Sequence, residues 1–543
     1  MISLGGGNPN PGTFPYRSMT FTLQTGEVIE VSEADMQKAL QYSPTNGLPD
    51  FVAWLKSLQI TEHKPPYENF ELCVGNGSQD VLTKACETAF EMLIAEGDYL
   101  LIESPAYVGS LAFLKPLSCQ FVEVATDAEG LNPDVLENVL ATWPDASTRP
   151  KVLYTVPIGG NPTGTSTTLE RKKRIYEIAK RYDIIILEDD PYYYLQFGAT
   201  RTASYFSMDV DRRVLRFDSL SKILSAGVRI GWVTGPAPLI ERIVLHGQTT
   251  NLHPSGVSQI LVYSLLKRWD IGGFISHADS VARFYATKRD VFLESANRHL
   301  TGLAKWTPPD AGMFFWIELL RIADSSDLIK TKAMEKKVLL VPGFEFFPNP
   351  RKTPYVRASF STATPQEIDE AVSRLAELVK EARAVAGEEV PKAPFPIRLN
   401  GVVSKGFGRG SRELGIPTAN LPEDVAQSMG NVLETGIYYG WASVGANQDG
   451  VNPMVMSYGW NPYYKNEKRS AEVHIMHDFG RDFYGEELRV IVAGYIRPEQ
   501  NYSCLDDLIT DINLDIQVAH KSLSRPAYQE LKSSAFILGT EKP

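Results

Sequence analysis

The chain has 543 residues, more than one hydrophobic core normally serves, so we expect several packed lobes. Hydrophobic residues make up 43% and charged residues 22%, close to the averages for soluble globular proteins, which excludes a mainly disordered, collagen-like or coiled-coil chain. The net charge of −11 excludes the basic surface that is typical of a general nucleic-acid binder.

Three features of the sequence concern the cellular location of the protein. No apolar run has the ~18–20 residues of a membrane span, and residues 1–7 lack the charged and apolar regions of a signal peptide. Four cysteines without CxxC spacing disfavour a disulfide scaffold and a zinc site. We therefore expect a cytoplasmic location and no contact with a membrane.

A glycine-rich turn follows the strand-like run at residues 70–74. Residues 75–79 (GNGSQ) open a helical pattern directly after that run. Free N–H groups at a helix N-terminus bind phosphate, so the turn predicts a phosphate contact.

Three later apolar runs each end in a polar cluster, and an amphipathic helix lies between the first two. Strand, helix and strand in this order predict a parallel α/β sheet, which binds ligands at the carboxyl ends of its strands. Each cluster taken alone could equally mark a turn. The runs are residues 152–156, 184–187 and 214–217, the clusters are 159–164, 188–192 and 218–222, and the helix face holds Ile175, Ile178, Ala179 and Tyr182.

Lys222 stands in the last of these clusters. A lysine in an apolar or cationic setting has a lowered pKa and can form a Schiff base, although a lone lysine is usually solvated. Two hydroxyls and a guanidinium lie within eleven residues, at Ser219, Ser221 and Arg229, and together they suit a phosphate group.

Two further polar residues extend this set. Asp189 at a strand end could keep a ring nitrogen protonated, and Tyr192 could bond a ring oxygen. With Lys222 and the phosphate contacts, they describe a pyridine ring with a phosphate arm, which is an electron sink held by a lysine.

Residues 1–387 resemble fold-type I aminotransferases that use pyridoxal 5′-phosphate (PLP). They are most similar to the branch with the α-aminoadipate/kynurenine and fungal aromatic aminotransferases. This implies a mostly parallel large domain, a small α/β domain, and amino transfer from an aromatic amino acid, kynurenine or 2-aminoadipate to a 2-oxo acid. The similar stretches are residues 2–11, 40–47, 75–79, 105–107, 161–164, 188–197, 219–231 and 355–361.

The resemblance also implies roles for single residues around the ring. Lys222 would hold the cofactor and later move the α-proton. Asp189 would pair with the ring nitrogen, Tyr192 with the phenolic oxygen, helped by Asn161, and Tyr107 would stack on the ring.

The phosphate and the substrate have their own implied contacts. Arg357 would bind the substrate α-carboxylate, with Asn161 and Gly7 beside it. The implied phosphate contacts are Ser78, Gln79, Ser219, Ser221, Arg229 and, from the partner subunit of a homodimer, Tyr42.

One departure concerns the start of the chain. Relatives carry a few dozen residues before the glycine run, and these form an arm over the active site. Here the run begins at Gly5, so we expect the arm to be missing and lid closure and substrate selection to differ.

A capping box at residues 364–367 (TPQE) begins a helix with one apolar stripe. The proline-rich residues 388–396 then predict a linker between a first domain, residues 1–387, and a second domain, residues 397–543.

The second domain opens with a β-like run that enters a glycine loop at residues 404–411. Such a loop, with Lys405 and Ser411, suits a phosphate, although glycines of this spacing are also common in turns. Thr418 and Asn420 then point to one side of an extended strand and could ligate Mg²⁺ together with phosphates and water.

A later strand pattern at residues 469–479 places Glu472 and His474 on one face. A carboxylate there could take a proton from a substrate hydroxyl. His474 and His477 lack a third ligand at a familiar spacing, which disfavours a metal site between them.

These motifs, in this order, resemble riboflavin kinase of the eukaryotic type. The family fold is a small closed β-barrel with a C-terminal helix. The similar stretches are residues 404–420, 435–444, 459–466, 474–477, 482–485 and 494–499.

The resemblance implies ATP-dependent phosphorylation of riboflavin to FMN. Thr418 and Asn420 would hold Mg²⁺, Glu472 would act as base on the ribityl 5′-hydroxyl, and His477 would lie near the flavin. The residues implied near ATP are Lys405, Ser411, Lys465 and His474.

Two interpretations of the whole chain stay open. The chain is either a bifunctional transferase, or a riboflavin kinase alone whose first segment is a non-catalytic dimerisation scaffold or a joined gene product. Both interpretations involve small-molecule substrates and a homodimer formed through the first domain.

Overall fold

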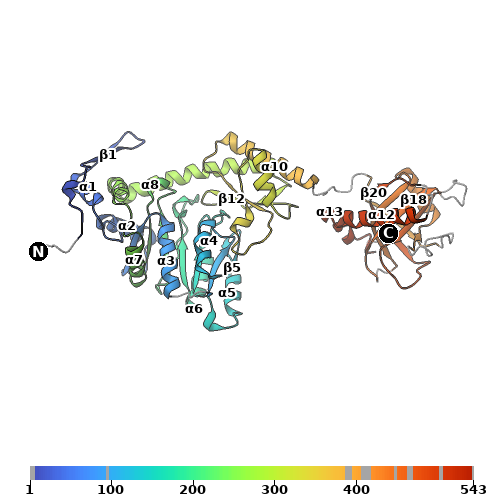
Figure 1. Ribbon diagram of the computed structural model, residues 1–543, viewed down its shortest axis with the longest axis horizontal. Coiled ribbons are helices and arrows are strands. Elements are labelled where there is room, and N and C mark those ends of the chain that lie inside the picture. The colour runs from blue at the N-terminus through green and yellow to red at the C-terminus, as the bar shows by residue number, and fades with distance from the viewer. Residues whose placement is uncertain are drawn as a thin grey trace. The chain divides into compact units, whose positions relative to one another are not determined.

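The computed structural model describes residues 7–92, 97–385, 394–404, 417–445, 449–460, 469–500 and 505–540 (Figure 1). The chain divides into two compact units, Met1–Val379 and Lys380–Pro543. No helix in this described part is long and apolar enough to cross a membrane.

The first unit is built on a large mixed sheet. In the described residues it has eight strands in the order β3-β10-β9-β8-β7-β4-β5-β6, and all run parallel except β10 and β6. The predicted parallel α/β sheet is confirmed. The strands are β3 (Phe70–Gly75), β4 (Tyr99–Ser104), β5 (Gln120–Asp127), β6 (Gly130–Leu131), β7 (Val152–Thr155), β8 (Ile185–Asp189), β9 (Val214–Ser219) and β10 (Gly231–Pro236).

Helices cover both faces of this sheet (Figure 1). One apolar core lies between the sheet and α3, α4 and α7, and others lie between the opposite face and α2, α5, α6 and α8. The predicted apolar face of α6 is buried against the sheet. The helices are α1 (Glu33–Leu40), α2 (Pro49–His63), α3 (Ser78–Met92), α4 (Val108–Leu114), α5 (Pro133–Ala141), α6 (Leu169–Arg181), α7 (Ala237–Thr250) and α8 (Gly256–His299).

Helix α8 is interrupted near its first third. Asp270 adopts φ +55°, and its carboxylate accepts a hydrogen bond from the backbone N–H of Gly273 at 2.9 Å. Asp270 thus ends one helical segment and caps the next, which explains the kink.

The remainder of the first unit is an antiparallel sheet of order β11-β12-β14-β13, an N-terminal hairpin and helix α10. The predicted capping box is confirmed, because Thr364 and Glu367 exchange side-chain-to-backbone hydrogen bonds. The elements are β1 (Met19–Thr22), β2 (Val28–Val31), β11 (Ala304–Trp306), β12 (Phe314–Leu319), α9 (Ala333–Glu335), β13 (Val341–Pro342), β14 (Tyr355–Ser359) and α10 (Pro365–Val385).

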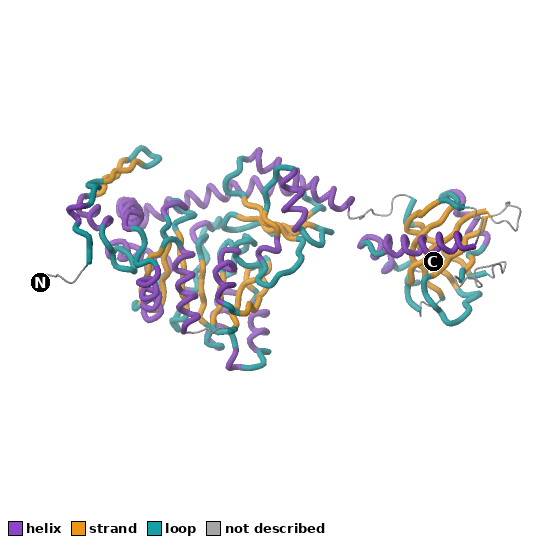
Figure 2. Tube along the Cα trace, in the orientation of Figure 1, coloured by secondary structure: helices purple, strands orange, loops and turns teal. Residues whose placement is uncertain are grey.

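The second unit is a curled antiparallel sheet, with the described strands in the order β15-β20-β17-β18-β19-β16. Its two edges meet where the backbone N–H of Ser404 donates to the carbonyl of Asn420 at 3.1 Å. Helix α12 lies across the strands (Figure 2), as the predicted barrel with a C-terminal helix requires. The elements are β15 (Ile397–Val402), β16 (Ala419–Asn420), α11 (Glu423–Ser428), β17 (Gly436–Val444), β18 (Asn452–Trp460), β19 (Arg469–Ile475), β20 (Glu487–Arg497), α12 (Leu505–Leu523) and α13 (Pro526–Gln529).

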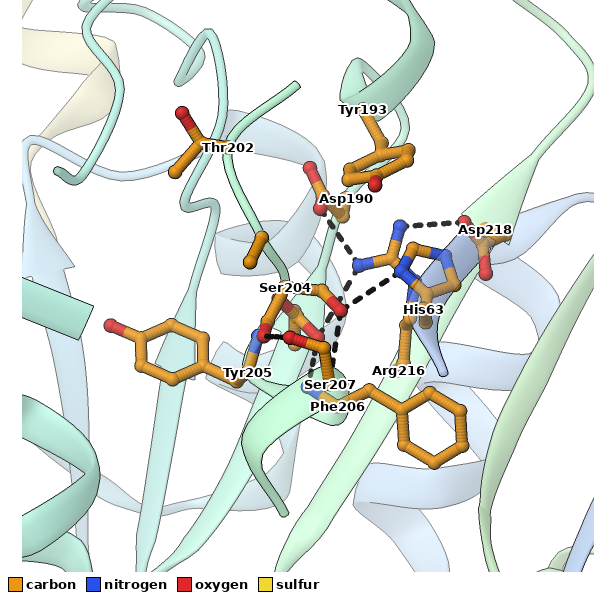
Figure 3. Close-up of polar contacts among 12 residues, drawn as sticks. His63, Asp190, Tyr193, Thr202, Ser204, Tyr205, Phe206, Ser207, Arg216 and Asp218 are labelled. Carbon is orange, nitrogen blue, oxygen red and sulfur yellow. Dashed lines mark hydrogen bonds and ion pairs between the residues drawn. The ribbon is translucent and has the colours of Figure 1, made fainter. Parts of the chain in front are cut away.

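A buried charge cluster lies against one face of the large sheet (Figure 3). The Arg216 guanidinium donates to Asp190 at 2.8 Å and to Asp218 at 2.9 Å, and it lies 3.3 Å from Glu188. All four side chains are almost fully buried. Because a buried ion is stable only with its counter-charge, Arg216 holds the ends of β8 and β9 together.

His63 completes this cluster (Figure 3). Its Nδ1 lies 2.9 Å from the Ser204 hydroxyl. Burial lowers the pKa of His63 well below its ordinary value, and the nearby Arg216 lowers it further. His63 is therefore neutral and adds no charge to the cluster.

Replacing Arg216 by Met should destabilise the first unit by about 3–5 kcal/mol, because three buried carboxylates would lose the cation that they share. Denaturant unfolding of the full chain measures the effect. The matched control is Arg298→Met, whose side chain is 54% exposed and pairs with Asp369; it should cost at most about 1 kcal/mol. Equal losses in the two variants would contradict the role given to Arg216.

Candidate active sites

The first candidate site lies at the carboxyl ends of β7, β8 and β9. Asp189 ends β8, Asn161 follows β7, and Lys222 follows β9 by three residues. Parallel neighbouring strands bring these ends to one edge of the sheet. The structure thus gathers three residues that are distant in sequence.

Asp189 is buried, and its carboxylate has an incomplete set of hydrogen-bond partners. The Tyr154 hydroxyl donates to its Oδ2 at 2.7 Å, whereas its buried Oδ1 has no hydrogen-bond partner among the described residues. Burial raises the pKa of Asp189 to about 7. A protonated ring nitrogen is the kind of donor that would satisfy Oδ1 and keep the carboxylate charged.

Lys222 is half-buried beside this strand end. Burial lowers the pKa of its ammonium, and the positive charges of Arg229 and Arg357 lower it further. A lysine in such a setting is more readily a neutral nucleophile. A hollow of about 330 Å³ leaves space beside it, bordered by residues 221–224 and by Ser280, Val281, Phe284 and Tyr285 of α8.

Arg357 of β14 reaches the same region from the small sheet. Its Nη1 donates to Asn161 Oδ1 at 2.8 Å, and its guanidinium lies over the rings of Phe314 and Phe346. Its buried Nε finds no acceptor in the part of the chain that the structure describes. Donors held between aromatic rings and not fully used suit a ligand carboxylate.

Two tyrosines line the space between Asp189 and Arg357. Tyr192 is buried and bonds Asn161, and Tyr107 is half-buried just before α4. Burial raises the pKa of both hydroxyls, and Asp189 raises them further, so both tyrosines are neutral.

A cup of polar groups lies where β3 meets α3. Arg229 donates to the Ser221 hydroxyl at 3.3 Å and to the Asn76 carbonyl at 3.1 Å. The Ser219 hydroxyl accepts from the backbone N–H of Ser221 at 3.2 Å. Arg229 itself has φ +53°, a conformation that is uncommon outside glycine.

Glycines allow this close approach. A Cβ on Gly77, which has φ +88°, would lie 2.4 Å from Arg229 Nη2, and a Cβ on Gly231 would lie 2.3 Å from the backbone nitrogen of Ser78. Ser78 and Gln79 begin α3, so their backbone N–H groups belong to the free first turn of that helix. The cup thus combines a guanidinium, hydroxyls and a helix N-terminus, all suited to a phosphate.

These residues fit PLP: the free Oδ1 suits a ring nitrogen and the cup suits a phosphate. Two predicted residues are not part of this arrangement within the chain. Gly7 and Tyr42 are exposed, and the Tyr42 ring contacts the edge of His253.

Sequence reasoning missed Tyr154 and the two phenylalanines around Arg357. Tyr154 lies in a fully buried four-residue strand, where a hydroxyl needs a partner, and that was the available signal. No comparable signal points to Phe314 or Phe346, which reach Arg357 from separate segments.

The second candidate site lies on β16 and β19. Asn420 is directly opposite Glu472 in the ladder, and the Thr418 side chain is hydrogen-bonded to the Glu472 carboxylate. Burial raises the pKa of Glu472, and the Thr418 bond partly offsets this. The structure thus brings together three predicted residues, with a carboxylate poised to accept a proton.

The histidines are placed differently from each other. His474 shares the Glu472 face of β19, and its Nδ1 lies 2.9 Å from the Pro417 carbonyl. His477 lies beyond the strand, exposed, with its ring against Phe479. Lys405, Ser411 and Lys465 lie outside the described residues.

Clusters of three or more His, Cys, Asp or Glu side chains that could hold a metal ion do not occur in the described ranges. The Thr418 and Asn420 oxygens are of the neutral type that Mg²⁺ accepts beside phosphate and water.

Comparison with known proteins agrees with this geometry. The family model "Aminotransferase class I and II" matches residues 12–375, and the model "Riboflavin kinase" matches residues 393–523. The kynurenine/alpha-aminoadipate aminotransferase of Rattus norvegicus, named as mitochondrial, is 46% identical over 395 residues, covering 70% of this chain and 92% of the relative. Aminotransferase tdiD of Emericella nidulans is 42% identical, with 70% and 89% covered.

Solved structures give the same result. The aminotransferase Aro8 of Candida albicans superposes with a TM-score of 0.65 at 28% identity, covering 70% of this chain and 92% of that one. A kynurenine aminotransferase of Pyrococcus horikoshii gives 0.60 at 29% identity, with 64% and 84% covered. The chain therefore belongs to the class I and II aminotransferase family and carries a riboflavin kinase domain after it.

Proposed function

We propose that the chain is a bifunctional transferase. Residues 1–387 would move an amino group from an aromatic amino acid, kynurenine or 2-aminoadipate to a 2-oxo acid with PLP. Residues 397–543 would phosphorylate riboflavin with ATP and Mg²⁺. The observation that carries the first activity is the buried Asp189 Oδ1 that lacks a donor among the described residues, next to a half-buried lysine.

For amino transfer, bound PLP supplies an electron sink for the carbanion formed at the substrate α-carbon. Asp189 keeps the ring nitrogen protonated, and the cup around Arg229 holds the phosphate. Arg357 holds the substrate carboxylate, which places the α-hydrogen near Lys222. Lys222 Nζ, with its lowered pKa, takes that proton and returns it.

For phosphorylation, Glu472 accepts the proton of the ribityl 5′-hydroxyl, and its raised pKa makes it a better base than an exposed glutamate. Thr418 and Asn420 hold Mg²⁺ beside it, and Lys405, Ser411, Lys465 and His474 contact ATP. His477 contacts the flavin.

We also propose a homodimer through the first domain, with Tyr42 of one subunit completing the phosphate cup of the other. The exposure of Tyr42 in the single chain, 57%, supports this. The sequence favours a cytoplasmic location, although the rat, bovine and mouse relatives are named as mitochondrial.

Lys222→Ala should reduce amino transfer at least about a thousand-fold, because it removes the group that moves the proton. It should also abolish the absorption band of lysine-bound PLP, while FMN formation continues at the parental rate. A parent chain with normal FMN formation but no amino transfer, even with excess PLP, would instead identify the first domain as a scaffold.

Glu472→Gln tests the other half, and its expected pattern is the reverse. FMN formation should fall at least about a hundred-fold because the amide cannot accept a proton, while amino transfer is unchanged. A radiolabelled-ATP assay measures FMN directly. The control is Glu487→Gln on β20, which removes a surface ion pair with Arg489 and should leave both activities intact. Full activity in Glu472→Gln would exclude it as the base.

Asp189→Asn should make the cofactor-free protein more stable at pH 8. The folded pKa of about 7 lies above the ordinary value of about 3.9, so the folded state favours the protonated acid and loses stability as pH rises from about 4 to about 7. The variant escapes this loss, gaining up to about 4 kcal/mol at pH 8 and less than half of that at pH 5. Denaturant unfolding at both pH values measures the gain, and an equal gain at both would contradict the assignment.

A further inference from the structure

A nearly buried ion pair lies one turn beyond the phosphate cup, on α3. Lys84 Nζ lies 3.0 Å from Asp80 Oδ2, and the two side chains are 7% and 23% exposed. Neither residue belongs to the sites described above. A lysine this deeply buried requires a reason, because burying its charge is costly.

The pair is tied to a second helix. Lys84 also donates to Asn251 Oδ1 at 2.8 Å, and Asn251 Nδ2 lies 3.4 Å from the same Asp80 oxygen. Asn251 is the C-terminal cap of α7. The three side chains therefore join the start of α3 to the end of α7.

Asp80 passes this constraint to the glycine turn. Its Oδ2 accepts a hydrogen bond from the backbone N–H of Asn76 at 2.8 Å, and the carbonyl of Asn76 accepts one from Arg229 at 3.1 Å. One residue, Asn76, thus links the ion pair to the guanidinium of the cup through its N–H and its carbonyl, next to Gly77, where a side chain would collide with Arg229.

The same contacts compensate the negative charge of Asp80 at the N-terminus of α3. A carboxylate in the first turn of α3 stabilises the empty helix through its dipole, but it would repel a phosphate dianion bound at that terminus. Lys84 places a positive charge 3.0 Å from that carboxylate, in a setting that excludes most of the water. Asp80 can therefore anchor the turn without opposing the ligand.

We propose that the Lys84–Asp80 pair positions the phosphate cup and neutralises it for the cofactor phosphate. Both residues act through Asn76 and Arg229 and do not touch the ligand, so they are positioning residues. The inference rests on the proposed use of PLP by the first domain. Its specific consequence is that the pair matters for the phosphate and not for the pyridine ring.

The test compares PLP with pyridoxal, which has the same ring and aldehyde but no phosphate. Full-length, cofactor-depleted protein is titrated with each, and the dissociation constant is read from quenching of protein fluorescence. Lys84→Met should weaken PLP binding roughly ten-fold, the size expected for a lost charged hydrogen bond, and should leave pyridoxal within about two-fold. The double variant Lys84→Met/Asp80→Asn should recover most of the loss, because it removes the uncompensated carboxylate.

Lys56→Met is the matched control, since Lys56 forms an ion pair with Glu71 at the opposite end of β3 and should change neither constant. Parallel losses of PLP and pyridoxal in Lys84→Met, no loss at all, or a double variant no better than the single one would each overturn the inference. A parent chain that binds neither compound would instead refute the proposed aminotransferase.

Asp80→Asn keeps the test decisive should Lys84→Met not fold. The amide can still accept from Asn76, and the neighbouring Lys84 would then favour the phosphate, so PLP binding should be held or become tighter. A selective fall in PLP affinity in this variant would overturn the neutralising role.

Discussion

The arrangement of the first unit depends on the cost of burying carboxylates at the end of one strand. Three acidic residues, Glu188, Asp189 and Asp190, follow one another at the end of β8, and their side chains point alternately to the two faces of the sheet. On one face the acids meet Arg216, which supplies the compensating charge. On the other face, the Tyr154 hydroxyl is the one hydrogen-bond partner of the Asp189 carboxylate among the described residues, and burial raises the pKa of Asp189 to about 7. The fold thus supplies a counter-charge on one side of the sheet, and on the other side it leaves Asp189 Oδ1 without a hydrogen-bond donor among the described residues.

In the second unit, the polar side chains of the candidate site are only partly buried. Buried and partly buried side chains alternate along β19. Ala471, Val473 and Ile475 face the core, while Glu472 and His474 face the other way. Asn420 of the short strand β16 lies opposite Glu472, and Thr418, two residues before Asn420, is hydrogen-bonded to the Glu472 carboxylate. Burial of this carboxylate raises the pKa of Glu472, and the Thr418 hydroxyl opposes the rise.

Much of this could be predicted because it depends on local periodicity. Polar clusters after apolar runs predicted the parallel sheet and the edge at which its ligand groups meet, and the capping box at Thr364 predicted where α10 begins. Contacts between segments that are distant in the sequence could not be predicted in this way. The bond from Tyr154 to Asp189 and the rings around Arg357 join segments whose meeting depends on the finished fold. Tyr42 and Gly7 stay predictions, since their roles need a second subunit or a bound substrate.

The backbone of Arg229 has a consequence for how this protein can change. At φ +53° an arginine is held in a region where glycine or asparagine would rest more easily, at a cost of roughly 1 kcal/mol. Selection for heat resistance alone would therefore favour exchanging it, and would remove the guanidinium from the cup in doing so. An exchange to glycine or asparagine would relieve this strain, but it would also remove the guanidinium that bonds Ser221 and the Asn76 carbonyl, so the gain in stability would come with the loss of part of the cup.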